Sequence, residues 1–165
     1  MKRTQKGFSL IELLIVVAII LIIAAIAIPN LLRARIAANE SSAVGSVRTI
    51  VTAEVTYSST WGTGFAASIA NLGGANPCVA AAAAACLIDP VLAAGNKSGY
   101  KLAAPGGAAV GGIVPTFAVS AVPQTVGQTG QRAFCSDESG VVRFNVTGLV
   151  VAATDVACQA LTPLQ

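Results

Sequence analysis

One carboxylate lies at the start of a long apolar run near the N-terminus. Residues 13–28 carry no polar or charged side chain, and Glu12 immediately precedes them. A carboxylate at membrane depth costs about 2.5–3.5 kcal/mol on insertion scales. A simple membrane anchor has no use for such a group, so Glu12 indicates a partner charge that is supplied when this segment meets another. The run therefore predicts an assembly segment as well as a membrane-spanning helix.

The length and flanks of the run support a retained membrane segment. Residues 8–28 would form a helix about 31 Å long, which matches the hydrocarbon core of a bilayer. The basic residues Lys2, Arg3 and Lys6 precede it and should stay in the cytoplasm, so the rest of the chain is expected on the far side. A cleaved secretory signal is disfavoured, because the run is too long and no small-x-small cleavage site follows it.

Composition excludes several functions for the remainder. The chain has 165 residues, 10 basic and 7 acidic. Without the three basic residues before the run, 7 basic residues (10 − 3) balance the 7 acidic ones, which leaves no basic surface for nucleic acid. There is no histidine, no GxSxG motif and no phosphate-binding glycine loop. We therefore expect no enzyme activity, no cofactor and no direct nucleic-acid partner.

The four cysteines lie outside the apolar run, at Cys78, Cys86, Cys135 and Cys158. An even number in a domain attached to a membrane segment favours disulfides in an oxidising compartment. Three pairings are possible, and the sequential one, 78–86 with 135–158, is favoured. Zinc binding is the alternative, but the spacing contains no CxxC pair. No metal site is therefore expected.

The sequence Lys-Gly-Phe-Ser-Leu-Ile-Glu at positions 6–12 resembles the processing signature of type IV prepilins and the related pseudopilins of type II secretion. The resemblance covers about the first thirty residues. It implies a leader at residues 1–7, cleavage between Gly7 and Phe8 by a prepilin peptidase, and methylation of the new Phe8 amine. It also implies that Glu12 meets the Phe8 amine of a neighbouring subunit. The alternative is that Glu12 balances the amine of its own chain, which lies one helical turn away.

The helical pattern continues beyond Pro29. Apolar residues recur at helical spacing, and polar residues, including Glu40 and Arg48, are assigned to the other faces. We predict one helix over residues 8–58, with an amphipathic continuation at 29–58. Proline removes a helical hydrogen bond, so Pro29 is expected to kink the helix, and in the resembling families this region bends or melts on assembly.

Residues 59–165 are predicted to form the globular domain. Short β-prone runs at residues 100–103, 116–122, 131–136 and 141–146 are separated by turn residues, and residues 137–140 connect the last two as a hairpin. The expected fold is α+β: a long N-terminal helix packed on one face of a four-stranded antiparallel sheet, as in type IV pilins. By resemblance, the bridge between Cys135 and Cys158 would bound an exposed C-terminal loop.

Together these features predict a structural subunit of a type IV pilus filament, held in the inner membrane before assembly into an extracellular polymer. The expected partners are copies of itself, the prepilin peptidase, and an inner-membrane platform driven by a separate ATPase. The main alternative is a major pseudopilin of a type II secretion system, which would be periplasmic; the acidic turn at Asp137 and Glu138 leans that way. A membrane-tethered enzyme or binding protein is the more distant alternative.

Overall fold

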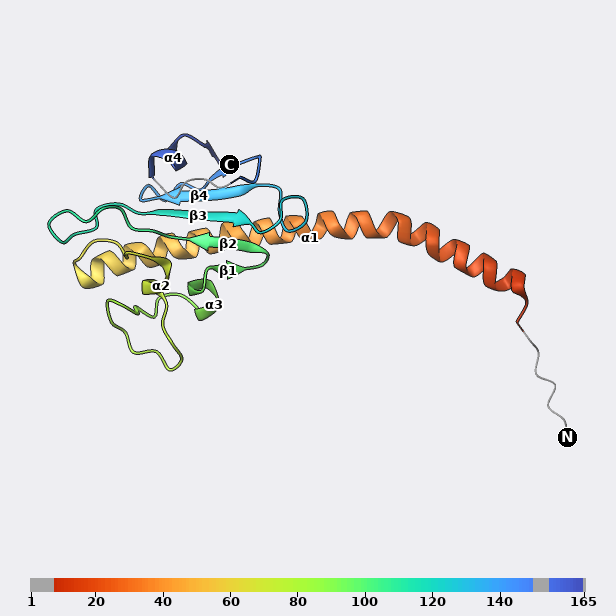
Figure 1. Ribbon diagram of the computed structural model, residues 1–165, viewed down its shortest axis with the longest axis horizontal. Helices are drawn as coiled ribbons and strands as arrows, with labels where there is room; N and C mark the ends of the chain where they lie inside the picture. Colours follow the sequence, from red (N-terminus) through yellow and green to blue (C-terminus); the bar gives the residue numbers. More distant parts are fainter. Residues whose placement is uncertain (1–7, 150–154, 165) are drawn as a thin grey trace. The chain divides into compact units, whose positions relative to one another are not determined.

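The computed structural model describes residues 8–149 and 155–164. The chain divides into two units, with the boundary between Arg35 and Ile36. One helix, α1 (Leu10–Trp61), runs through both (Figure 1). The sequence predicted this helix over residues 8–58, and the helix continues without interruption through Pro29.

A six-stranded antiparallel sheet packs against α1 in the globular unit (Figure 1). The strands follow chain order, and each pairs with the next one as a meander. They are β1 (Asn96–Lys97), β2 (Tyr100–Ala103), β3 (Ala118–Pro123), β4 (Ala133–Asp137), β5 (Arg143–Asn145) and β6 (Thr162–Pro163). The α+β fold is confirmed, but the prediction of four strands is wrong, because β1 and β6 extend the sheet at its two edges.

The described part of the globular unit also contains three short helices: α2 (Ile69–Leu72), α3 (Pro90–Ala93) and α4 (Asp155–Gln159). The segment containing α2 and α3 connects α1 to the sheet. In α3, Pro90 occupies the first turn and the Asp89 carboxylate accepts a hydrogen bond from the Leu92 amide at 2.9 Å, as expected of a helix N-cap.

The core lies between the sheet and the C-terminal half of α1. On α1 the buried positions recur every three or four residues, so one stripe of the helix faces the strands. The stripe consists of Glu40, Ala43, Ser46, Val47, Ile50, Ala53, Glu54 and Tyr57. Large side chains from the sheet region meet it, among them Tyr100, Phe117 and Phe134, all of which are buried.

Strand β4 is buried on both faces, which the prediction of one helix-covered face did not include. Phe134 belongs to the core beneath α1, whereas its neighbours Ala133 and Cys135 pack with Cys158 in a second cluster. Side chains of successive strand residues point to opposite faces, so the C-terminal segment covers the face of β4 that α1 does not. The disulfide Cys135–Cys158 holds that segment in place, with the two Cα atoms 5.8 Å apart.

Candidate functional site

The first turn of α1 uses Glu12 as a cap. The Ser9 amide donates a hydrogen bond to the Glu12 carboxylate at 2.9 Å, and the Leu13 amide donates to the Ser9 carbonyl at 3.3 Å. The first amides of a helix have no partner within it, so a carboxylate three residues on is well placed to accept from one. Phe8 is exposed immediately before this turn, and Gly7 lies outside the described residues.

Glu12 therefore has a local role in the structure, beside its predicted role between subunits. The carboxylate is exposed together with the Ser9 amide that it caps. The contact between Glu12 and the Phe8 amine, of a neighbour or of its own chain, stays a prediction.

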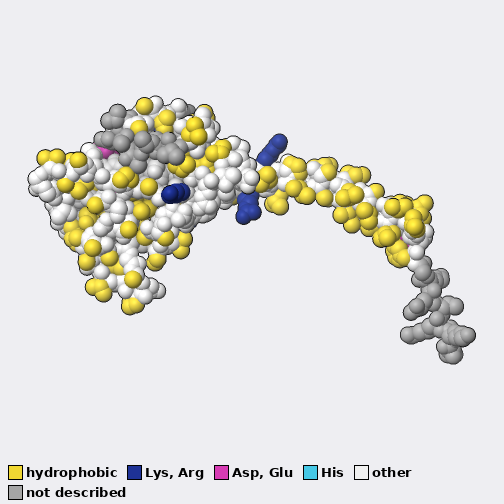
Figure 2. All heavy atoms as spheres, in the orientation of Figure 1, with side chains coloured by type: hydrophobic (Ala, Val, Ile, Leu, Met, Phe, Trp, Pro, Cys, Tyr) yellow, Lys and Arg dark blue, Asp and Glu magenta, His cyan; other side chains and the backbone are white. Residues whose placement is uncertain are grey.

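The N-terminal unit presents its apolar side chains outward. The helix is long and apolar enough to cross a membrane, and none of its most apolar stretch is buried. Hydrophobic side chains cover this part of α1 in Figure 2. Monomeric soluble proteins rarely expose continuous apolar surface of this extent, so the unit requires lipid or another protein around it. Pro29 lies inside this helix and cannot donate to the Ala25 carbonyl, so the predicted kink there stays a prediction.

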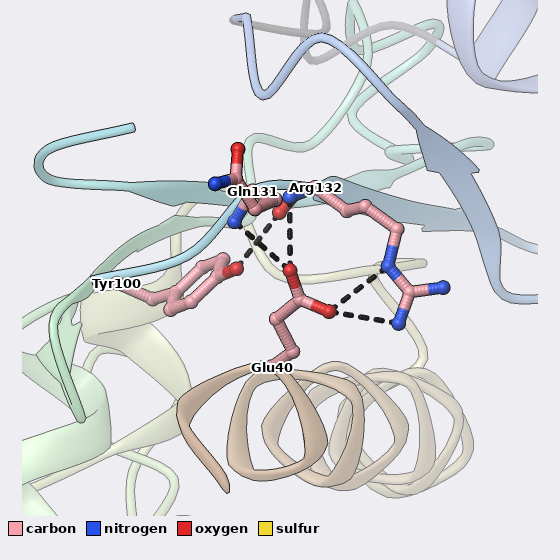
Figure 3. A network of polar contacts seen from close by, with 4 residues as sticks. All are labelled: Glu40, Tyr100, Gln131 and Arg132. Atoms are coloured by element: carbon pink, nitrogen blue, oxygen red, sulfur yellow. Dashed lines mark hydrogen bonds and ion pairs between the residues drawn. The ribbon is translucent and has the colours of Figure 1, made fainter. Parts of the chain in front are cut away.

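In the globular unit, Glu40 joins α1 to the start of β4 (Figure 3). One carboxylate oxygen accepts from the Gln131 and Arg132 amides at 2.9 and 3.1 Å. The other oxygen accepts from Nε and Nη2 of Arg132 at 2.9 and 2.7 Å. The Tyr100 hydroxyl donates to the Arg132 carbonyl at 2.8 Å, which fixes the same segment from β2.

The electrostatics of this network keep Glu40 ionised. Burial opposes the charge, but the hydrogen bonds from Gln131 and Arg132 and the attraction of the guanidinium outweigh it and lower the pKa of Glu40. The guanidinium of Arg132 also lies 5.5 Å from the ring centres of Phe134 and Phe144. The assignment of Glu40 to an outer face of the helix was therefore wrong. Its spacing of three and seven residues from Ala43 and Val47 places it on the buried stripe.

Glu54 is a second buried carboxylate on α1, and sequence reasoning did not identify it. Its Oε2 accepts a hydrogen bond from the Ala66 amide at 2.8 Å, whereas Oε1 has no hydrogen-bond partner among the described residues. Burial raises the pKa of Glu54 to about 7, and the bond from Ala66 offsets only part of this effect. This carboxyl links α1 to the segment that follows it and is close to half-protonated at neutral pH.

The stability of the globular unit should consequently fall as pH rises from 4.5 to 7. The unfolded chain loses the Glu54 proton near pH 4.5 and the folded chain near 7, so the stabilisation is complete below pH 4.5 and is lost across that interval. The shift corresponds to about 3 kcal/mol in the free energy of unfolding. Urea unfolding of the chain in detergent, followed by Trp61 fluorescence, measures it.

Glu54→Gln is the matched variant for this measurement, because it keeps the shape and the acceptor for Ala66 but cannot ionise. The difference in stability between the variant and the original chain should grow with pH, since the other carboxylates contribute equally to both. A difference that stays constant between pH 5 and 8 would show that Glu54 does not titrate in this range.

The chain contains both sequential disulfides, Cys78–Cys86 and Cys135–Cys158. The first closes an alanine-rich loop, and its Cα atoms are 6.1 Å apart. The Tyr57 hydroxyl donates to the Ala82 carbonyl at 2.8 Å and ties that loop to α1. At the β4–β5 turn, Asp137 accepts hydrogen bonds from the amide and hydroxyl of Ser139, so its carboxylate is used in shaping the turn.

Comparison with known proteins identifies the N-terminal segment. Residues 2–28 match the family model described as the prokaryotic N-terminal methylation motif. The chain is 67% identical over 39 residues to the type IV wide pilus major component PilA4 of Thermus thermophilus, which covers 24% of this chain and 30% of that protein. It is 45% identical over 53 residues to the type IV major pilin protein PilA of Myxococcus xanthus, covering 32% of this chain and 24% of that protein.

Over this segment the chain is similar to type IV pilins. It spans less than a third of the length of these two relatives, so the likeness lies in a short, strongly similar stretch. No solved structure matches the chain. The matched residues include Gly7 and Phe8, the predicted cleavage and methylation positions, as well as Glu12, whereas Glu40, Glu54 and Arg132 lie outside this 27-residue segment.

Proposed function

We propose that this chain is the structural subunit of a type IV pilus filament. In this proposal the precursor is held in the inner membrane by residues 8–28, cleaved between Gly7 and Phe8 by a prepilin peptidase and methylated on the Phe8 amine. An inner-membrane platform with a separate ATPase then adds it to a polymer outside the cell. The chain acts by assembling, and any chemistry on it is done by other proteins.

The observation that carries the proposal is the unburied apolar surface of α1 with one carboxylate at its N-terminal end. In a membrane, lipid covers this surface; in a filament, the same surface on other subunits replaces lipid. Close van der Waals packing between the helices stabilises the filament. The Glu12 carboxylate of one subunit also binds the Phe8 ammonium of its neighbour, and this contact forms in one axial register of the two helices. The two relatives are named as a major pilus component and a major pilin, which supports a filament subunit.

The first experiment is to shear cells that express the chain at its native level and to examine the sheared material. We expect long filaments in electron micrographs and an intact mass that starts at methylated Phe8, four hydrogens lighter for the two disulfides. A chain that still begins at Met1 would overturn the proposed processing. A mature chain that stays in the envelope, with secretion lost on deletion, would favour the pseudopilin instead.

A further inference from the structure

An apolar turn projects from the globular unit between β2 and β3. We call residues 108–114 the tip; none of them is charged or has a polar side chain. Its outer side chains Val110 and Ile113 are 71% and 51% exposed. The backbones of these two residues bond to each other at 2.8 and 3.1 Å around Gly111 and Gly112. Both glycines have positive φ, of 61° and 83°, which makes a tight two-residue turn.

The tip is fixed at the C-terminal end of α1. The Val114 amide donates to the Thr63 carbonyl, and the Phe65 amide donates to the Val114 carbonyl, both at 3.0 Å. The loop between β2 and β3 extends beyond the end of α1 in Figure 1. The tip is thus a supported projection, and the space around its two glycines is open, since an added Cβ would meet nothing within 4 Å at either.

A groove lies at the opposite end of the same unit. It has a volume of about 250 Å³ and is lined by Ala37, Glu40, Ser41, Val44, Arg132 and Leu164. A water molecule occupies about 30 Å³ of liquid, so the groove has room for side chains. Glu40 and Trp61 are 21 residues apart on α1, which places the groove about 32 Å from the end that carries the tip.

The groove and the tip have complementary chemistry. Glu40 neutralises Arg132, so the groove presents apolar walls without a net charge to an uncharged tip. Nη1 of Arg132 makes no hydrogen bond within the described part of the chain, and it points away from Glu40 in Figure 3. The carbonyls of Gly111 and Gly112 likewise have no partner there, and they are suitable acceptors for such a donor.

We propose that the tip of one subunit docks into the groove of a second copy of this chain. Surfaces at opposite ends of a subunit make a head-to-tail contact, which propagates into an open polymer when it does not close into a ring. The first groove residue, Ala37, follows the N-terminal unit directly in sequence. A second subunit that packs along residues 8–28 of the first is therefore brought close to the groove. This interface rests on the proposed filament function and concerns one set of neighbours in it. Subunits joined tip to groove are offset by about 32 Å along α1, whereas subunits joined through Glu12 and Phe8 are offset by about 6 Å.

Cysteine cross-linking in assembled filaments tests the contact. The chain carrying Val110→Cys and Ala37→Cys should form filaments whose subunits, after mild oxidation, run as a ladder of covalent multimers on a non-reducing gel. Val91→Cys with Ala37→Cys is the matched control, because Val91 is 58% exposed and apolar but lies in α3, outside both the tip and the groove. It should give no ladder.

The outcomes separate this interface from the filament function. If the unsubstituted chain forms no filaments, the proposed function fails and the interface with it. Filaments that form but show no ladder, or the same ladder with the control pair, overturn the interface alone. Dimers from Val110→Cys without the second cysteine would mean that tips meet tips, which also overturns it.

A charge exchange provides an independent readout without cysteines. Val110→Asp should leave the fold intact, because the side chain is exposed. It should cause a loss of filaments, because a carboxylate without a counter-ion would enter a groove in which Glu40 and Arg132 already neutralise each other. Adding Ser41→Lys in the groove of the same chain should restore filament yield. Restoration by Ser41→Lys supports direct contact, whereas normal yield from Val110→Asp alone contradicts it.

Discussion

Replacement of Glu12 by alanine is expected to remove filaments while leaving cleavage and methylation intact. A hydrogen bond to a charged partner contributes about 1.5–3 kcal/mol, and each 1.4 kcal/mol changes an association constant tenfold. Each subunit contact should therefore weaken by about tenfold or more, and the loss is repeated along the whole polymer. Intact mass of the membrane-held chain and the quantity of sheared filament measure the two effects separately.

Replacement of Glu12 by glutamine separates the role of its charge from its role as a helix cap, which alanine does not. Glutamine at position 12 can still accept the hydrogen bond that the Ser9 amide donates, but it carries no charge. If Glu12 serves only as a helix cap, Glu12→Gln should assemble normally. If the carboxylate must meet the Phe8 ammonium of a neighbour, Glu12→Gln should fail as alanine does. Glu138→Ala, an exposed carboxylate in the β4–β5 turn, controls for a general loss of negative charge.

Removal of the Glu40 carboxylate should give the largest loss of stability in the globular unit. Glu40→Ala leaves the Arg132 guanidinium without its counter-ion and the amides of Gln131 and Arg132 without an acceptor. Breaking a buried ion pair from one side costs about 3–5 kcal/mol. We expect about 3 kcal/mol, the lower end, because the Arg132 side chain stays 40% exposed. Urea unfolding in detergent measures this loss.

Two control variants complete the urea-unfolding measurement on Glu40→Ala. Glu40→Gln keeps an acceptor for the two amides, so it should lose less stability than Glu40→Ala. Glu138→Ala should change stability by less than about 0.5 kcal/mol, as surface substitutions usually do. Because the pKa of Glu40 is lowered, its contribution is complete above pH 4.5 and is lost as acid protonates the folded state. A loss for Glu40→Ala no larger than that of Glu138→Ala would mean that this network does not hold β4 to the helix.

The long helix was predictable because its signal is spread over fifty residues. The apolar run and the stripe that follows it both have helical spacing, and Pro29 and Gly45 stand singly within them without breaking it. The end at Trp61 instead of residue 58 is a small difference. The prediction treated Ser58 and Ser59 as residues that end the helix. In the structure their hydroxyls donate hydrogen bonds to the carbonyls of Val55 and Thr56, so both residues belong to its last turns.

The buried carboxylates were not predictable from polarity. A pattern based on hydrophobicity assigns every glutamate to solvent, and Glu40 and Glu54 are exceptions for different reasons. Glu40 is buried because Arg132, ninety-two residues away in sequence, supplies a counter-ion. Glu54 is buried with one amide donor and close to half-protonated at neutral pH. The sequence positions of these residues did carry a signal. Glu40 lies seven residues before Val47 and Glu54 lies four residues after Ile50, so both fall on the same face of α1 as these buried side chains.

The two edge strands were missed because each has only two residues. In β1, Lys97 pairs with Tyr100 across a turn made by Ser98 and Gly99, both at positive φ. That Ser-Gly pair is a hairpin signal, but the residues before it show no strand alternation. In β6, Pro163 argues against a strand, and its pairing with Arg143 depends on a C-terminal segment that the disulfide Cys135–Cys158 brings back to the sheet.

The same two strands also bear on how such a chain avoids misassembly. An open sheet edge offers unpaired amides and carbonyls to any other chain, and long flat edges promote aggregation. Here one edge is β1, which carries Lys97, and the other is β6, whose Pro163 has no amide proton to donate. In the proposed filament, many identical sheets would lie close together. With edges this short, one of them carrying a lysine and the other a proline, the globular units resist strand exchange and amyloid-like stacking.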